Sequence, residues 1–343
     1  MAEDPHPRRA AIRRFFAVAS LFFFLGTGAF VSDSPIPRND SQQVALRRPV
    51  DLPGLPLALG TGELVLVDGW ELSSNNSDFG GFSALFAQGD GRLLALTDGA
   101  VLAGFTITDG AIAAESFVAP LPIRKGERAT KSDQDAESLT FDPVSGRFWV
   151  GYEQIHRIRR FSPGFGRAEA SAQPLPMRDW PKNGGAEAIA RLPDGRFLVF
   201  AEARYMTEGI TDALIFATDP AEPGAAYARF GYRPPDGYRI TDIAQLPDGR
   251  LIALHRRFAL ASGVSAKIGL IDLADVQADA VVSPRIIATL APPLPVDNME
   301  GIAVESQGQQ AIVWIISDDN FNAFQRSLLL KFVFSAAPAL PQS

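Results

Sequence analysis

The sequence contains no cysteine and only three histidines in 343 residues. Without cysteine the chain cannot form disulfides, thiolate metal sites, a cysteine nucleophile or a lipid-modified cysteine anchor. The histidines, His6, His156 and His255, are too few and too scattered for a zinc or iron centre with several imidazole ligands. The net charge of −7 argues against broad nucleic-acid binding, because that activity needs a basic surface.

Several catalytic motifs are absent as well. The sequence has no Walker loop, no dinucleotide-binding glycine fingerprint, no His-Glu-x-x-His and no Arg-His-Gly phosphatase motif. The segment Gly81-Phe82-Ser83-Ala84-Leu85 is not a Gly-x-Ser-x-Gly nucleophile elbow. Ser83 is therefore not expected to act as a serine nucleophile.

Residues 1–31 form a separate N-terminal segment. Arg13 and Arg14 precede residues 15–31, an apolar stretch without charge. A basic start followed by such a stretch predicts an export signal, and Arg-Arg-Phe-Phe resembles a twin-arginine signal. The alternative is an uncleaved anchor, since about 17 apolar residues are at the short end of a membrane span. The body of the protein is thus expected to be periplasmic or secreted, or tethered, with membrane contact only through residues 15–31.

The rest of the chain divides into a linker, a long repetitive body and a short tail. Residues 32–57 are aperiodic and contain proline, serine and arginine, which predicts a linker. Five similar units follow, each with a hydroxyl or acidic anchor, alternating apolar residues, a glycine-containing turn and a polar end. Spacings of 54, 50, 55 and 58 residues separate the anchors Ser83, Glu137, Glu187, Asp242 and Glu300.

Each unit has the pattern of a propeller blade. Three or four short β-prone runs per roughly 50 residues are typical of such blades. We therefore predict an all-β fold, a β-propeller of five or six blades with six slightly favoured, over residues 58–336, followed by a tail at 337–343. The strand at residues 63–67 would pair with the last strand and close the ring. A pair of β-sandwiches is the alternative fold, but it does not explain the repeat length.

The ends of the repeats predict an acidic site. Both ends of a hairpin lie at the same rim, so anchors on axial strands would converge around a central channel. Such carboxylates need a cation, an arginine partner or raised pKa values, and calcium suits oxygen ligands better than zinc does. The predicted metal ligands are Glu137, Glu187 and Glu300, followed by Asp242, Glu153, Glu202 and Asp318. The side chains predicted to hold a small anionic substrate are Arg204, Arg257 and Arg326.

The repeated acids also have a purely structural interpretation. One carboxylate per blade could bond backbone N–H groups and lock neighbouring blades together. Under that interpretation the protein is a non-enzymatic propeller that binds a ligand or an envelope partner.

The repeats resemble one known family. The resemblance rests on motifs spread in order over about residues 60–335, namely Gly80–Leu85 with Asp90-Gly91-Arg92, Asp135–Leu139, Asn183–Ala188, Asp297–Gly301 and Ser317–Asn322. They look like the family called esterase-like activity of phytase, the phytase-like domain proteins. A departure is His255-Arg256-Arg257, where Glu-Arg would be expected at the end of the fourth hairpin.

The resemblance implies hydrolysis of phosphoesters or esters by a calcium-binding propeller. We therefore expect an exported, monomeric hydrolase of phosphoesters such as phytate-like substrates, with calcium at the acidic pocket. Two alternatives remain open, the non-enzymatic binding propeller and a calcium-dependent lactonase or carboxylesterase.

Overall fold

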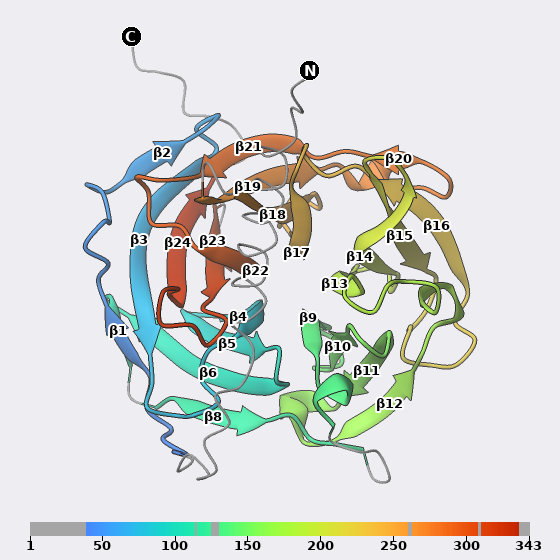
Figure 1. Cartoon of the computed structure of the whole chain (residues 1–343), viewed down its shortest axis with the longest axis horizontal. Coiled ribbons are helices and arrows are strands. Elements are labelled where there is room, and N and C mark those ends of the chain that lie inside the picture. Colours follow the sequence, from blue (N-terminus) through green and yellow to red (C-terminus); the bar gives the residue numbers. More distant parts are fainter. Residues whose placement is uncertain (1–38, 114, 125–129, 260–262, 308–309, 336–343) are drawn as a thin grey trace, which may run out of the picture. The chain divides into compact units, whose positions relative to one another are not determined.

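The computed structural model describes residues 39–113, 115–124, 130–259, 263–307 and 310–335. Within them the chain forms short strands grouped into five sheets (Figure 1). The predicted signal or anchor at residues 1–31 lies outside the described residues, as do residues 32–38 of the predicted linker and the predicted tail. Among the described residues we find no helix with the length and apolar character of a membrane span.

The sheets are the blades of a β-propeller, numbered here along the chain. The first blade contains β4 (Phe82–Gly89), β5 (Arg92–Thr97), β6 (Val101–Thr108), β7 (Ala111–Ile112) and β8 (Phe117–Pro120). The second contains β9 (Ala136–Phe141), β10 (Phe148–Tyr152), β11 (Arg157–Phe161) and β12 (Ala168–Ala172). The third contains β13 (Ala186–Arg191), β14 (Phe197–Thr207), β15 (Ile210–Phe216), β16 (Tyr227–Tyr232) and the parallel β20 (Val281–Val282). The fourth contains β17 (Arg239–Gln245), β18 (Leu251–Ala259), β19 (Gly263–Ile271) and β21 (Arg285–Leu290).

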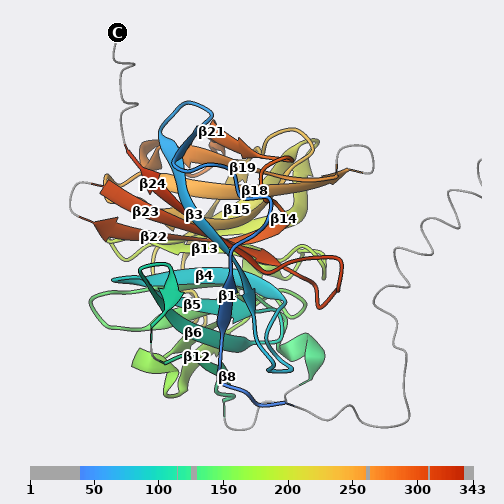
Figure 2. The ribbon, with the colours of Figure 1, turned by 90° about the vertical axis from the view of Figure 1, so that its left-hand side faces the viewer.

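The fifth blade combines strands from both ends of the described chain. It contains β22 (Asn298–Gln307), β23 (Gln310–Asp318), β24 (Leu328–Phe334), β3 (Leu64–Ser73), β1 (Ala45–Arg47) and β2 (Leu57–Leu59). Figure 2 faces this blade, in which β3 pairs antiparallel with β24. The propeller prediction is confirmed, with five blades rather than the slightly favoured six, and β3 is the predicted closing strand. The stretch predicted to be a linker contains β1, which pairs with β3.

The hairpin turns follow the predicted chemistry. In the turn between β13 and β14 the Asp194 carboxylate accepts a hydrogen bond from the Arg196 N–H at 3.0 Å, and Gly195 has a φ of 93°. The turn between β17 and β18 repeats this arrangement, with Asp248 accepting from the Arg250 N–H at 3.0 Å. Aspartate satisfies the local backbone and glycine adopts the positive φ at little cost, so both turns reverse the chain tightly.

Apolar packing holds the blades to one another. Within the described residues, 3-10 turns at Lys131–Asp133, Pro163–Phe165, Leu175–Met177 and Leu273–Asp275 lie outside the sheets. The buried apolar residues form five clusters, one between each pair of adjacent blades. One cluster joins the fourth and fifth blades and includes Leu254 and Ile268 together with Leu66 of β3. The closing strand is therefore part of the core as well as of the sheet.

We predict that Leu66→Ala destabilises the protein by about 2–5 kcal/mol, because it leaves a cavity at a fully buried position. The free energy of unfolding, measured by urea denaturation, tests this. Leu175→Ala is the matched control, since the same truncation at a residue with 65% exposure should change stability by no more than about 0.5 kcal/mol. Equal effects of the two substitutions would show that β3 does not hold the ring closed.

Candidate functional site

Each innermost strand contains one extra residue at the same level. The innermost strands β4, β9, β13, β17 and β22 surround the centre of the propeller (Figure 1). Each pairs with the next strand of its blade, and each pairing shifts register once near the start of the innermost strand; the pairing of β4 with β5 shifts a second time, between Ala87 and Gly89. The residues left without a register partner by the five shifts near the strand starts are Ser83, Glu137, Glu187, Thr241 and Glu300. Such bulges re-aim a side chain, and they are frequent beside active sites.

Two further positions of each blade lie at the same rim. The first is the residue two positions before the bulge. The second is the residue of the second strand that lies opposite that first residue. These pairs are Gly81 and Asp98, Asp135 and Glu153, Gly185 and Glu202, Arg239 and Arg256, and Asn298 and Asp318. We call the eight acids among the bulge and rim positions the acidic rim: Asp98, Asp135, Glu137, Glu153, Glu187, Glu202, Glu300 and Asp318.

The acids of the rim lie close enough to change one another's ionisation. Burial raises the pKa of Glu137 and of Glu187 well above the usual value, and neighbouring carboxylates of their own blades and of other blades add to the rise. For the same main reason the pKa of Glu153 rises to about 7, that of Glu300 to about 8 and that of Asp318 to about 7. Desolvated like charges of this kind favour either protonation or a bound cation.

Two groups of acids have the spacing of a metal site. The carboxylate oxygens of Asp135, Glu137 and Glu153 lie within 4.8 Å of one another, and so do those of Glu153, Glu187 and Glu202. Glu153 belongs to both groups and can therefore connect them. The donors are all oxygens, which suit a hard cation such as calcium. This geometry brings together four of the seven predicted ligands: Glu137, Glu153, Glu187 and Glu202.

Two arginines of the fourth blade neutralise part of the rim. Arg256 donates from Nη2 to Glu202 at 3.1 Å, and its Nε lies 2.8 Å from Glu300 Oε1. Arg239 donates to the other oxygen of Glu202 at 3.0 Å. The Nδ2 of Asn298 donates to Glu300 at 2.7 Å and to Asp318 at 3.4 Å. Glu300 and Asp318, both predicted ligands, are thus held by polar groups of the fourth and fifth blades.

Asp242, another predicted ligand, has a structural position. Its two carboxylate oxygens accept hydrogen bonds from the backbone N–H groups of Ile243 and Ile302, each at 2.8 Å. Ile302 is in the fifth blade, so Asp242 joins two blades, as the structural interpretation of the acids expects. The bulge of the fourth blade is Thr241, and its neighbour Asp242 points to the other face because side chains alternate along a strand.

The hydroxyl bulges also join neighbouring blades. Ser83 Oγ donates to the carbonyl of Ala136 at 2.6 Å, and Thr241 Oγ1 donates to that of Met299 at 3.2 Å. Each carbonyl belongs to the residue just before the bulge of another blade. The five bulges therefore divide into three carboxylates and two hydroxyls that connect blades.

The three predicted substrate arginines have different surroundings. Arg204 is exposed on β14, two residues beyond Glu202. The Arg257 guanidinium lies over the Tyr238 ring at 4.8 Å. Arg326 forms a two-bond ion pair with Asp51, at 3.1 Å for each bond. Arg326 is thereby attached to the segment that precedes β2.

Five residues of the rim lie outside the predicted site set, namely Asp98, Asp135, Arg239, Arg256 and Asn298. Asp135, Arg239 and Asn298 lie two residues before the bulges, a position that aligning the repeats on their anchors alone does not reveal. What identifies this position is that its residue lies opposite an acid or arginine on the second strand of the same blade.

His255 is a buried structural residue rather than a residue of the rim surface. It is fully buried, with Nε2 2.5 Å from the Tyr232 hydroxyl and Nδ1 3.1 Å from the Lys267 carbonyl. Burial lowers the pKa of His255 to about 4. The neutral imidazole supports β18 next to Arg256.

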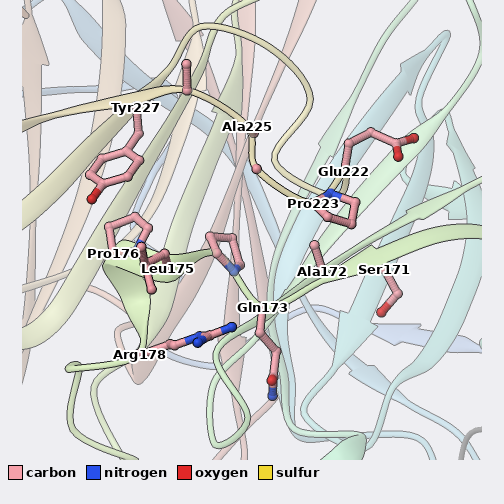
Figure 3. A pocket seen from close by; sticks show the side chains of 13 residues that line it. Ser171, Ala172, Gln173, Leu175, Pro176, Arg178, Glu222, Pro223, Ala225 and Tyr227 are labelled. Carbon is pink, nitrogen blue, oxygen red and sulfur yellow. The ribbon is translucent and has the colours of Figure 1, made fainter.

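A cavity of about 700 Å³ lies outside the rim, between segments 171–178 and 222–227 (Figure 3). Pro174, Leu175, Pro176, Arg178 and Tyr227 form part of its lining, and no acid of the rim contributes. Its wall is fixed by a hydrogen bond from Arg229 to the Pro176 carbonyl at 3.0 Å. The cavity thus belongs to the loop that leads into β13.

Comparisons with known proteins agree with the repeats. A family model described as "Phytase-like: Esterase-like activity of phytase" matches residues 77–321. No curated protein matches the chain.

The solved structures that resemble the chain are distant. They include the Kuenenia stuttgartiensis hydrazine synthase, at 13% identity and a TM-score of 0.35 over 73% of this chain and 59% of that one. A nidogen/laminin complex has 9% identity and a TM-score of 0.37 over 80% and 88% of the two chains. A luciferin-regenerating enzyme has 11% identity and a TM-score of 0.41 over 86% and 96%. At these identities and TM-scores, the functions of these proteins say nothing about the function of this chain.

We predict that stability without divalent cations falls by about 2 kcal/mol or more between pH 6.5 and 9. The raised pKa of Glu300, about 8, means that the folded state holds a proton that the unfolded state has released. This stabilisation is full below pH 4.5 and is lost as the pH rises through 8, at about 1.4 kcal/mol per pKa unit. Urea unfolding with a chelator at several pH values measures it, and Glu300→Gln should make the fall less steep without abolishing it, because Glu153 and Asp318, with pKa values of about 7, also lose protons in this range. A rise in stability over this range would contradict the prediction.

A second prediction separates Asp242 from the metal-site acids. Asp242→Asn should lower the free energy of unfolding by about 1–3 kcal/mol, because one buried N–H loses its acceptor. The loss should be the same with and without calcium chloride, as measured by urea denaturation. Glu187→Gln is the comparison and should reduce the stabilisation by calcium. Loss of calcium stabilisation in Asp242→Asn would instead identify Asp242 as a ligand.

Proposed function

Because the chain belongs to the phytase-like family, described by esterase-like activity of phytase, we propose that it is an exported phosphoester hydrolase. The observation that carries this proposal is the convergence of eight acids from four blades on one rim, where burial raises the pKa values of Glu137, Glu153, Glu187, Glu300 and Asp318. Calcium bound there would neutralise phosphate charge and activate the attacking water. Export is part of the proposal through residues 1–31.

The metal ligands proposed are Glu137, Glu153 and Glu187, together with Asp135. These four acids belong to the two groups whose oxygens lie within 4.8 Å. Glu202, Glu300 and Asp318 would act around them, since arginine and asparagine side chains bond to them. Asp242 is the weakest of the ligands predicted from the sequence, because both of its oxygens already accept backbone N–H groups.

The anionic part of a substrate would be held by arginines near the rim. Arg204 is exposed beyond Glu202, and Arg257 stacks on Tyr238 while following Arg256 on β18. Arg326 would have to leave Asp51 before it could bind phosphate. The first two residues are therefore the better candidates for holding substrate oxygens.

A specific observation favours a second candidate function, a calcium-dependent lactonase or carboxylesterase. The Phe321 ring and the Asp98 carboxylate both lie against Gly81. A Cβ placed on Gly81 would be 2.6 Å from the ring and 2.8 Å from Asp98 Oδ1, so Phe321 lies beside the acidic rim. Phe321 is 57% exposed and could contact an apolar substrate group. A panel of lactones and carboxylic esters tests this candidate.

We predict that Glu153→Gln and Glu187→Gln each reduce phosphate release by at least about 100-fold, since each removes a proposed ligand. Release from p-nitrophenyl phosphate and from phytate is measured with calcium and with a chelator. The control is Glu115→Gln, the same change at an exposed residue between β7 and β8. Release that resists both substitutions and the chelator would contradict the mechanism. Strong calcium stabilisation with no turnover of any ester would favour a non-enzymatic binding propeller.

A further inference from the structure

Two connections between strands project from the face of the propeller that carries the acidic rim, which we call the rim face. The second strand of each blade runs to the rim, so the connection that follows lies on this face. In the first and second blades it is short, at residues 98–100 and 153–156. In the third blade β14 continues past Glu202 to Thr207, and in the fifth residues 319–327 connect β23 to β24. Figure 2 shows the latter connection extending beyond the ends of the strands.

Both longer connections expose large apolar side chains. Tyr205 and Met206 on β14 are half-exposed, and between β23 and β24 Phe321 is exposed and Phe324 is 95% exposed. The position of Phe324 is fixed by its backbone N–H, which donates to Asn322 Oδ1 at 3.0 Å. Single exposed apolar residues are common on protein surfaces, whereas groups of them on one face mark interaction sites. The rim face therefore carries two apolar tips beside the acids.

Positive charge lies beside one of these tips. Arg204 is exposed next to Tyr205 on β14. Arg233 is exposed too, and its Nη1 would be 3.7 Å from a Cβ placed on Gly209 in the turn of the same hairpin. Apolar tips with adjacent arginines fit a phospholipid surface, since the acyl region accepts apolar side chains and the phosphates attract guanidinium groups. Glu208 in this turn is exposed as well, so insertion would be shallow.

The described part of the chain also begins on the rim face. Asn39 and Ser77 exchange two hydrogen bonds at 2.9 Å, one from the Asn39 N–H to Ser77 Oγ and one from the Ser77 N–H to the Asn39 carbonyl. Further along the same segment, the Gly81 N–H donates to Asp319 Oδ1 at 3.0 Å. Asp319 begins the connection that carries Phe324, so the start of the described chain and one apolar tip belong to the same face.

The sequence before Asn39 favours a bilayer as the partner of this face. Residues 15–31 are apolar and uncharged, and only residues 32–38 separate them from Asn39. A segment of that length reaches at most about 28 Å. A bilayer that contained residues 15–31 would therefore be within reach of the face on which Asn39 lies.

We propose that the rim face docks on a phospholipid bilayer through the β14–β15 hairpin and the β23–β24 connection. The apolar tips would enter the headgroup layer, and the arginines of the hairpin would contact lipid phosphates. The acidic rim would then face the membrane. This contact adds to the one predicted for residues 15–31. It goes beyond the proposed function and does not depend on it, because neither tip requires a catalytic rim.

Site-specific fluorescence in the full-length chain tests this orientation. Because the chain has no cysteine, Met206→Cys and Phe324→Cys each accept a single environment-sensitive NBD label. Emission is recorded with and without phosphatidylcholine vesicles, whose lipid carries no net charge and does not repel the rim. The emission of both labels should shift to shorter wavelength, and lipids with a spin-labelled acyl chain should quench it, because both labels enter the bilayer.

The matched control is Val144→Cys with the same label. Val144 is 92% exposed in the turn between β9 and β10, at the face opposite the rim, and its label should keep the emission that it has in water. In the Met206→Cys background, Phe324→Ser should weaken the shift, because the two tips insert together. Val144→Ser in the same background should leave the shift unchanged.

Two results would overturn the docking surface. The first is emission of the labels on the two tips that stays as in water while the protein sediments with the vesicles, which would assign binding to residues 15–31 alone. The second is an equal shift at Val144→Cys, which would show that the propeller has no fixed orientation on lipid. Absence of phosphate release from soluble p-nitrophenyl phosphate would instead contradict the proposed function and leave the docking surface standing.

Discussion

One extra residue in each innermost strand is the constraint on which the site depends. Without the bulge, each anchor residue would pair with the second strand of its blade, and side chains would alternate regularly between the two faces of the sheet. With it, Glu137, Glu187 and Glu300 are released from pairing at the same level of three blades. The ring can carry these bulges because apolar clusters pack the blades together, in addition to the hydrogen bonds that Ser83, Thr241 and Asp242 make between blades.

The bulges create an electrostatic problem that the protein meets in two ways. Burying carboxylates that face one another is unfavourable, and it raises the pKa values of Glu153 and Glu300. On one side of the rim Arg256 and Arg239 supply positive charge. On the other side the acids keep the spacing of a metal site. The same ring can therefore be partly structural and partly functional.

Much of this architecture can be predicted from the sequence. The period of the repeats, the Asp-Gly turns and the spare strand before the first repeat are local patterns, and they give the propeller and its closure. The blade count is harder, because β3 and β1 add to the fifth blade instead of forming another. Residues 45–47 look like linker sequence, and only their pairing with β3 makes them a strand.

The site is predicted less completely, for a geometric reason. Asp242 is acidic like the other anchors, but the bulge of its blade is one residue earlier, at Thr241. Because side chains alternate along a strand, this shift of one residue turns the Asp242 side chain to the other face. Asp135 is missed because its place depends on the residue opposite it, Glu153, which sequence spacing does not show.

The two roles of the acids can be told apart by what their oxygens contact. The Asp242 oxygens accept N–H groups that are fixed in the backbone, so a metal would have to displace hydrogen bonds that hold two blades together. Glu187 faces other carboxylates instead, and a cation there would relieve repulsion rather than break a contact. Arg256 acts as such a cation, because its own positive charge relieves the repulsion between Glu202 and Glu300.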